Sequence, residues 1–143
     1  MALVETHWFT KGGKNLVEAE ASWATMNAFC ALLKNATTLD QDAPEVFADV
    51  VANEATGTGY TPGGVAIANR SVTVDAASNE TRLIGDPVQW TPSTIGARWA
   101  IIYINAGAKP LLGYVDFISD RFSEAGLFRI EWPVTGVLRT RAL

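Results

Sequence analysis

Short segments rich in β-branched and aromatic residues recur through the second half of the chain, about 8–12 residues apart. Glycine, proline, asparagine and serine residues, which favour turns, separate these segments. Chains with this spacing fold as antiparallel sandwiches or barrels, because each short strand must bury one face against a neighbouring layer. The sequence therefore predicts a mainly β protein, an antiparallel β-sandwich or barrel, with one or two short helices in the N-terminal half.

The strongest strand signal is Trp99–Ile104, which is apolar throughout. A strand that is apolar on both faces belongs in the middle of a sheet whose two faces are covered. The turn residues of Gly107–Pro110 follow, and then a second apolar run, Leu111–Phe117. We expect the two runs to pair as a hairpin.

Three further segments, Ser71–Asp75, Arg82–Trp90 and Leu127–Trp132, alternate between apolar and polar residues. This alternation predicts half-buried strands, and Thr91–Ser93 is expected to turn the chain after the second of them. The side chains expected to face the core are Val72, Val74, Val88, Trp90, Phe128, Ile130 and Trp132.

The N-terminal half carries weaker signals. Asn15–Ala21 predicts a short helix with Asn15 as its N-cap. Pro44–Val50 predicts one or two helical turns, with proline at the first helical position. Trp23–Lys34 favours a strand buried on both faces, although its alanine content also fits a helix. We expect a single domain over residues 1–143, with extended segments at about 1–14 and about 134–143.

Composition excludes several classes of protein. The 143 residues carry 11 basic and 15 acidic side chains, a net charge of −4, which argues against a nucleic-acid-binding or polybasic membrane-surface protein. No apolar run approaches the roughly 18 residues of a membrane-spanning helix, and the N-terminus lacks the pattern of a secretory signal. We therefore expect synthesis in a cell's cytoplasm, with no membrane and no nucleic-acid partner.

Carboxylate pairs are the first candidates for chemistry. Glu18 and Glu20 stand in polar sequence, which is typical of a solvated surface rather than of two acids aimed into a cleft. Asp40 and Asp42 have the Asp-x-Asp spacing of a calcium loop but lack its glycine and distant glutamate. A structural loop is the better interpretation.

Nucleophiles and phosphate loops are equally weak candidates. The lone Cys30 lies in an apolar run and fits an inert core thiol. His7 is the single histidine, so a catalytic triad or a histidine-rich metal site is not expected. The glycine-rich stretch 57–64 has no lysine and leads into a strand, unlike a phosphate-binding loop. We predict no catalytic, cofactor-binding or metal-binding residue, no cofactor, and no enzyme activity.

Five tryptophans allow two interpretations. A row of exposed indoles would stack on sugar rings, as in a carbohydrate-binding sandwich. Trp90, Trp99 and Trp132 fall in step with apolar neighbours, which favours the core. Trp8 and Trp23 are less clear, and Trp8 with Phe9 forms the best candidate for an exposed apolar pair, a feature typical of interfaces.

Residues 53–64 carry the pattern Asn-Glu-x-x-Gly-x-Gly-Tyr-x-x-Gly-Gly. Further recognisable segments follow in order: Ser71–Asp75, Val88–Ile95, Arg98–Ile104, Lys109–Phe117 and Phe128–Trp132. This order of motifs over residues 45–132 resembles small virion structural proteins of tailed bacteriophages, which include head decoration and tail-associated proteins. The resemblance implies a component of the virion.

We therefore expect a capsid decoration (cement) protein that binds the outer capsid surface and stabilises contacts between major capsid subunits. Its partners would be the major capsid protein and neighbouring copies of itself, in many copies or as a homo-oligomer, with the virion as its final location. The alternatives are a tail or head–tail connector component and, second, a carbohydrate-binding β-sandwich. The candidate contact residues lie at the two ends: Trp8, Phe9, Arg139, Arg141 and Leu143.

Overall fold

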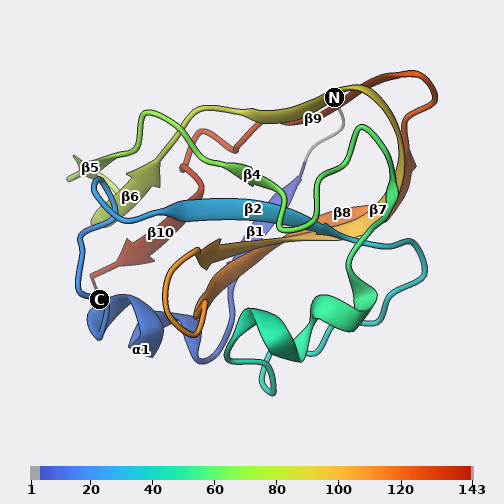
Figure 1. The fold of residues 1–143 in the computed structure, drawn as a ribbon. Helices are drawn as coiled ribbons and strands as arrows, with labels where there is room; N and C mark the ends of the chain where they lie inside the picture. Colours follow the sequence, from blue (N-terminus) through green and yellow to red (C-terminus); the bar gives the residue numbers. More distant parts are fainter. Residues whose placement is uncertain (1–3, 143) are drawn as a thin grey trace.

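The computed structural model describes residues 4–142 and confirms a mainly β chain whose strands pair antiparallel (Figure 1). The helical elements are α1 (Gly12–Val17) and two 3₁₀ turns, η1 (Phe47–Asp49) and η2 (Val51–Asn53). The strands are β1 (Glu5–Trp8), β2 (Ala28–Leu33), β3 (Gly57–Thr58), β4 (Val65–Ala66), β5 (Ser71–Asp75), β6 (Glu80–Ile84), β7 (Val88–Ile104), β8 (Leu111–Phe122), β9 (Gly126–Ile130) and β10 (Leu138–Arg141).

The long strand β7 lies in the middle of the larger sheet. This sheet has the order β1-β8-β7-β2-β4, and β3 and β9 also pair with β7. One side of β7 pairs first with β9, where Val88 is opposite Ile130, and later with β8, where Tyr103 is opposite Leu111. The predicted hairpin and the predicted central position of Trp99–Ile104 are therefore both confirmed.

The turn expected at Thr91–Ser93 is wrong, because β7 runs through these residues without reversing. The pairing with β9 instead shifts register between Trp90 and Ser93. A proline is tolerated at such an irregularity, since the missing N–H falls where the ladder of hydrogen bonds is already interrupted. The polar and proline residues therefore mark an irregularity within one strand rather than the end of a strand.

The larger sheet is buried on both faces, and each face has its own core. Alternate residues explain the division: Cys30 and Ile102 point into the first core, and Ala31 and Ile101 point into the second. The first core lies against the second sheet, and the second core lies beneath η1, with Phe47 packed on Tyr103 at a ring-centroid distance of 4.7 Å. The strand predicted within Trp23–Lys34 is confirmed as β2.

The second sheet has three strands in the order β10-β6-β5. Leu83 of β6 and Leu138 of β10 are buried in the first core, but β5 extends beyond it. The prediction that Val72 and Val74 face the core is wrong, because their side chains are 48% and 75% exposed. Their alternation is real, but no core lies beneath β5. The other predicted inward residues, Val88, Trp90, Phe128 and Ile130, are buried, and Trp132 is partly buried against the first core.

The short helix begins earlier than predicted, and Asn15 is not its cap. Helix α1 starts at Gly12, with Lys11 in the N-cap position. The buried Asn15 amide instead donates hydrogen bonds to the carbonyl oxygens of Glu45 (3.0 Å) and Leu111 (2.8 Å). Gly12 allows the close contact with β8, since a Cβ there would lie 1.9 Å from the Leu112 carbonyl oxygen. The helical signal of Pro44–Val50 is confirmed in part by η1.

Candidate functional site

The glycine-rich motif, residues 53–64, is held in place by hydrogen bonds to the neighbouring strands. The Glu54 carboxylate accepts hydrogen bonds of 2.6 Å from the Tyr60 hydroxyl and from the backbone N–H of Gly63. The Tyr60 oxygen accepts the Leu32 N–H at 3.1 Å, and the Tyr103 hydroxyl donates to the Gly63 carbonyl at 2.6 Å. Desolvation, followed by the hydrogen bond to Glu54, raises the pKa of Tyr60. Glu54, Tyr60 and Gly63 therefore tie the loop to β2 and β7.

The five tryptophan side chains pack within the folded chain. Trp23 and Trp90 are buried, and the other three are partly buried. Four indole N–H groups donate to backbone carbonyl oxygens: Trp8 to Arg139, Trp23 to Ile84, Trp99 to Thr37 and Trp132 to Asp86. None of the five offers a fully exposed ring for stacking on a sugar.

The N-terminal candidates belong to the folded body. Strand β1 pairs with β8, and the following Phe9 N–H donates to the Leu112 carbonyl at 3.1 Å. The Phe9 ring is 1% exposed and contacts Tyr114, so the expectation that Phe9 is exposed is wrong. The Trp8 indole is fixed to β10 by its 2.7 Å hydrogen bond to the Arg139 carbonyl.

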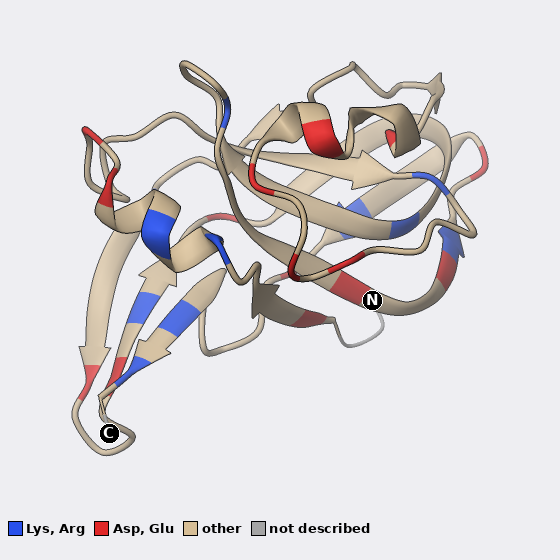
Figure 2. Ribbon diagram, turned by 90° about the horizontal axis from the view of Figure 1, so that it is seen from below, with Lys and Arg blue, Asp and Glu red and all other residues tan. Residues whose placement is uncertain are grey.

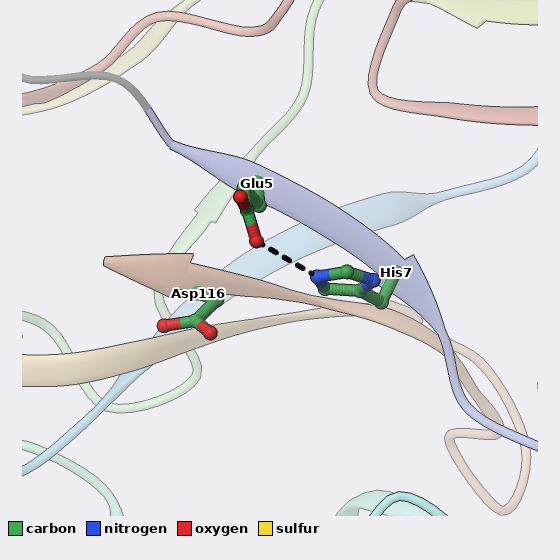
Figure 3. A group of neighbouring side chains, drawn as sticks. All are labelled: Glu5, His7 and Asp116. Carbon is green, nitrogen blue, oxygen red and sulfur yellow. Dashed lines mark ion pairs between the residues drawn. The ribbon is translucent and has the colours of Figure 1, made fainter. Parts of the chain in front are cut away.

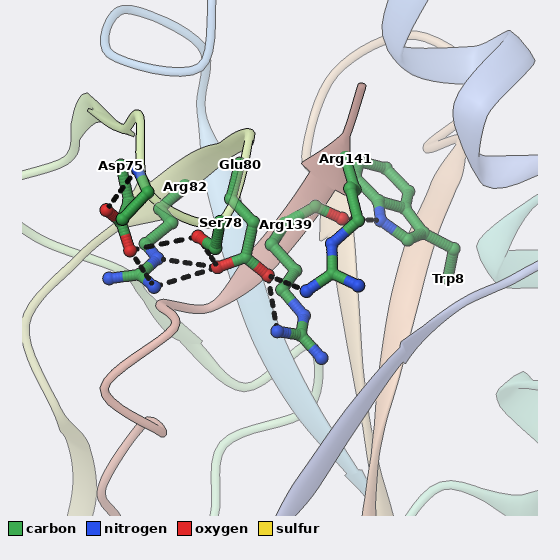
Figure 4. Close-up of polar contacts among 8 residues, drawn as sticks. Trp8, Asp75, Ser78, Glu80, Arg82, Arg139 and Arg141 are labelled. Atoms are coloured by element: carbon green, nitrogen blue, oxygen red, sulfur yellow. Dashed lines mark hydrogen bonds and ion pairs between the residues drawn. The ribbon is translucent and has the colours of Figure 1, made fainter. Parts of the chain in front are cut away.

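The C-terminal candidates Arg139 and Arg141 surround one carboxylate, that of Glu80 (Figure 4). The Glu80 side chain is 1% exposed and accepts hydrogen bonds from Arg82 at 2.8 Å, Ser78 at 2.9 Å and Arg139. These hydrogen bonds, led by that from Arg82, outweigh desolvation and hold the pKa of Glu80 at about 2. A carboxylate with this environment stays ionised and acts as a structural anchor for β10.

The register of the sheet explains this network, because Arg141 lies opposite Glu80 and Arg139 lies opposite Arg82 on one face. Figure 2 shows basic and acidic positions along neighbouring strands at the end of the molecule marked C. Arg139 and Arg141 keep about half of their side chains exposed, at 51% and 56%. The last candidate, Leu143, lies outside the described residues.

A cluster that sequence reasoning missed joins Glu5, His7 and Asp116 (Figure 3). One ligand atom from each lies within 4.8 Å of the others, and His7 Nε2 lies 3.5 Å from Glu5 Oε2. An imidazole and two carboxylates are a donor set that a divalent transition metal accepts. However, Asp116 Oδ1 is already bound by Arg98 at 2.8 Å and by the Ile118 N–H at 2.7 Å, so a cation would compete with an existing ion pair.

The predicted inert character of Cys30 and of the Asp40 loop has a structural basis. Cys30 is fully buried in the first core, and desolvation raises the pKa of its thiol. Asp40 Oδ1 accepts the backbone N–H groups of Asp42 (2.8 Å) and Ala43 (3.4 Å), which closes a local turn. Its carboxylate therefore shapes the loop.

Two of the hollows on the surface lie next to apolar side chains. A cleft of about 590 Å³ between α1 and the β7–β8 turn includes Met26, Ile104 and Glu45, and Lys14 binds Glu45 at its rim. A smaller apolar hollow of about 120 Å³ lies where β8 passes into β9.

The smaller hollow is bordered by two exposed apolar side chains, Phe122 (75% exposed) and Leu127 (54% exposed). Arg121 and Arg129 flank it. An apolar patch with a charged rim is typical of a protein–protein contact surface.

Comparisons with protein-family models, with curated proteins and with solved structures found no match. In the part of the chain that the structure describes, no helix has both the length and the apolar character needed to cross a bilayer.

Proposed function

We propose that this protein is a structural component of a bacteriophage virion, and specifically a capsid decoration protein. In this proposal it binds the outer surface of the capsid and stabilises contacts between major capsid subunits. The order of sequence motifs over residues 45–132 supports the virion assignment.

The observation that carries an adhesive role is where the exposed apolar side chains lie. Phe122 and Leu127 border the hollow on β8 and β9, and Val72 and Val74 lie on the edge strand β5. Exposed apolar side chains gathered on rigid strands favour binding to another protein surface. The sugar-binding alternative loses its main support, because no indole is fully exposed.

We assign the contact with the capsid to the hollow bordered by Phe122 and Leu127. Arg121 binds the Phe117 carbonyl but no carboxylate among the described residues, so it fits an acidic group on the partner. Arg129, by contrast, already pairs with Glu131 at 3.0 Å. The apolar centre of the hollow fits a protruding apolar side chain. Each contact of this size is weak, but many copies on one shell act together. The two ends contribute by holding the sheets in place rather than by reaching to the partner.

Counting copies per purified virion tests the location. Several hundred copies support decoration of the shell, whereas about six or twelve copies indicate a tail or head–tail connector component instead. Absence from the particle refutes both.

A variant pair tests the surface. Phe122→Asp is expected to abolish binding to capsids that lack the protein, measured by co-sedimentation. Val134→Asp is the matched control, because Val134 is 88% exposed and lies outside the hollow, and this variant is expected to bind like the wild type. Equal binding by both variants would contradict the assignment of the hollow.

A further inference from the structure

The outer edge of β5 is open. In the three-stranded sheet β6 pairs on both sides, and the far side of β10 is covered by Trp8 through its hydrogen bond to the Arg139 carbonyl. Within residues 4–142, β5 pairs with β6 alone, and Ser71–Val74 are all exposed. Figure 1 places β5 at the left end of the molecule, away from the body of the larger sheet. Its outward backbone N–H and C=O groups are free to pair with another strand.

The side chains of β5 suit strand addition. Val72 and Val74 lie on the same face and are 48% and 75% exposed, and Thr73 between them is also β-branched. Edge strands are ordinarily protected by lysine, proline or an inward charge, and residues 71–74 have none of these. The one charged residue, Asp75, is held at its carboxylate by Arg82 at 2.9 Å.

We propose that β5 pairs antiparallel with β5 of a second copy of this chain, about a twofold axis through Thr73. The two three-stranded sheets then become one continuous six-stranded sheet. This inference rests on the proposed function and deepens it, because it names the surface through which neighbouring copies meet.

The sequence of β5 is complementary to itself in this register. With Thr73 opposite Thr73 of the second copy, Val72 faces Val74 in both halves, which buries the exposed valines against each other. Ser71 faces Asp75, so a hydroxyl donor meets a carboxylate. The two Asp75 side chains lie about 13 Å apart along the strands, so like charges do not meet. In this register each of the five residues of β5 lies opposite a residue of β5 in the second copy.

The contact is small, well below the roughly 1,600 Å² of a standard protein–protein interface. We therefore expect weak association in dilute solution and effective association when copies are held close together on a shared lattice.

Sedimentation velocity of the purified chain from about 10 μM to about 1 mM tests the pairing. We expect the wild type to shift from monomer to dimer over this range and Val74→Lys to remain monomeric. Val134→Lys introduces the same charge at an exposed site outside β5 and is expected to dimerise like the wild type. A wild type that stays monomeric throughout overturns the proposal, and so does a dimer that survives Val74→Lys.

Disulfide cross-linking tests the register. Thr73→Cys is expected to form a covalent dimer on mild oxidation, because directly opposite residues have the Cα separation that a disulfide requires. Val72→Cys and Val74→Cys are expected to cross-link when mixed and at least several-fold less when each is oxidised alone. The native Cys30 is fully buried and does not interfere. Self-cross-linking of Val72→Cys that equals the mixture overturns the twofold register.

Both experiments use only the purified chain, so their failure is separate from failure of the capsid assignment. A monomeric wild type whose Val74→Lys variant loses binding to capsids would show that β5 receives a strand of the capsid protein, and it would overturn pairing between copies.

Discussion

Replacing Leu138 by alanine tests whether the C-terminal strand is part of the core. Leu138 is 1% exposed, and truncating a buried leucine to alanine costs about 2–5 kcal/mol of stability. The cavity has little room to collapse, because the Leu138 Cδ atoms fill the space over Gly113, where a Cβ would lie 2.6 Å from Leu138 Cδ2. Gly113 belongs to β8, which is paired on both sides, so its backbone is held in place. We therefore expect a loss of about 3–4 kcal/mol.

Urea unfolding followed by tryptophan fluorescence measures this loss, and we expect the thermal midpoint to fall by about 10 °C. Val134→Ala provides the matched control, since Val134 is 88% exposed and its truncation should change stability by less than about 0.5 kcal/mol. If Leu138→Ala were as stable as this control, the reasoning that β10 is a core strand would be refuted.

Three further results are expected. The pKa of Glu80 is lowered from 4.5 to about 2, so its contribution to stability is complete above pH 4.5 and is lost as the pH falls to 2. Glu80→Gln should remove this part of the acid dependence of stability, measured by urea titrations at several pH values. An unchanged pH profile in this variant would contradict the prediction. The Cys30 thiol should react with an aromatic disulfide reagent at mildly alkaline pH only after unfolding, because burial raises its pKa; rapid reaction of the folded chain would contradict the burial. Gly64→Ala should cost at least about 1 kcal/mol, since φ is +79° and the new Cβ would lie 1.9 Å from the Cys30 carbonyl oxygen. Gly13→Ala, which meets no atom within 4 Å and lies in α1, should instead stabilise the chain; calorimetry compares the two.

Features set by neighbouring residues could be predicted from the sequence. Trp99–Ile104 is apolar on both faces, and a strand with this pattern has one stable place, between two covered faces. The short turn that follows then leaves an antiparallel hairpin as the simplest path for Leu111–Phe117. Cys30 shares this logic, because a small apolar side chain in a doubly buried strand is enclosed whatever the strand order.

Features set by distant residues could not be predicted. Asn15 has the sequence signature of a cap, but its amide binds the Leu111 carbonyl, 96 residues away. Val72 and Val74 alternate like core residues, but alternation does not reveal whether a second layer lies beneath. The cluster of Glu5, His7 and Asp116 depends on the register of β1 against β8, where Glu5 lies opposite Asp116. No pattern within either segment of the sequence indicates how β1 aligns with β8.

The pairing of the two chain ends determines which surfaces are left for partners. Trp8 covers β10, and the arginines of β10 bind Glu80. The hydrogen-bonding groups of the two ends are therefore paired within the chain, and one edge of the smaller sheet is closed. The open edge of β5 and the apolar hollow between β8 and β9 remain. Figure 1 draws β5 at the left end of the molecule, away from β8. Under the proposed function, two separate surfaces would allow one copy to hold a neighbour and the shell at the same time, so each weak contact would raise the local concentration for the other. A variant that loses either surface should therefore leave the capsid far more readily than the loss of one small contact would predict.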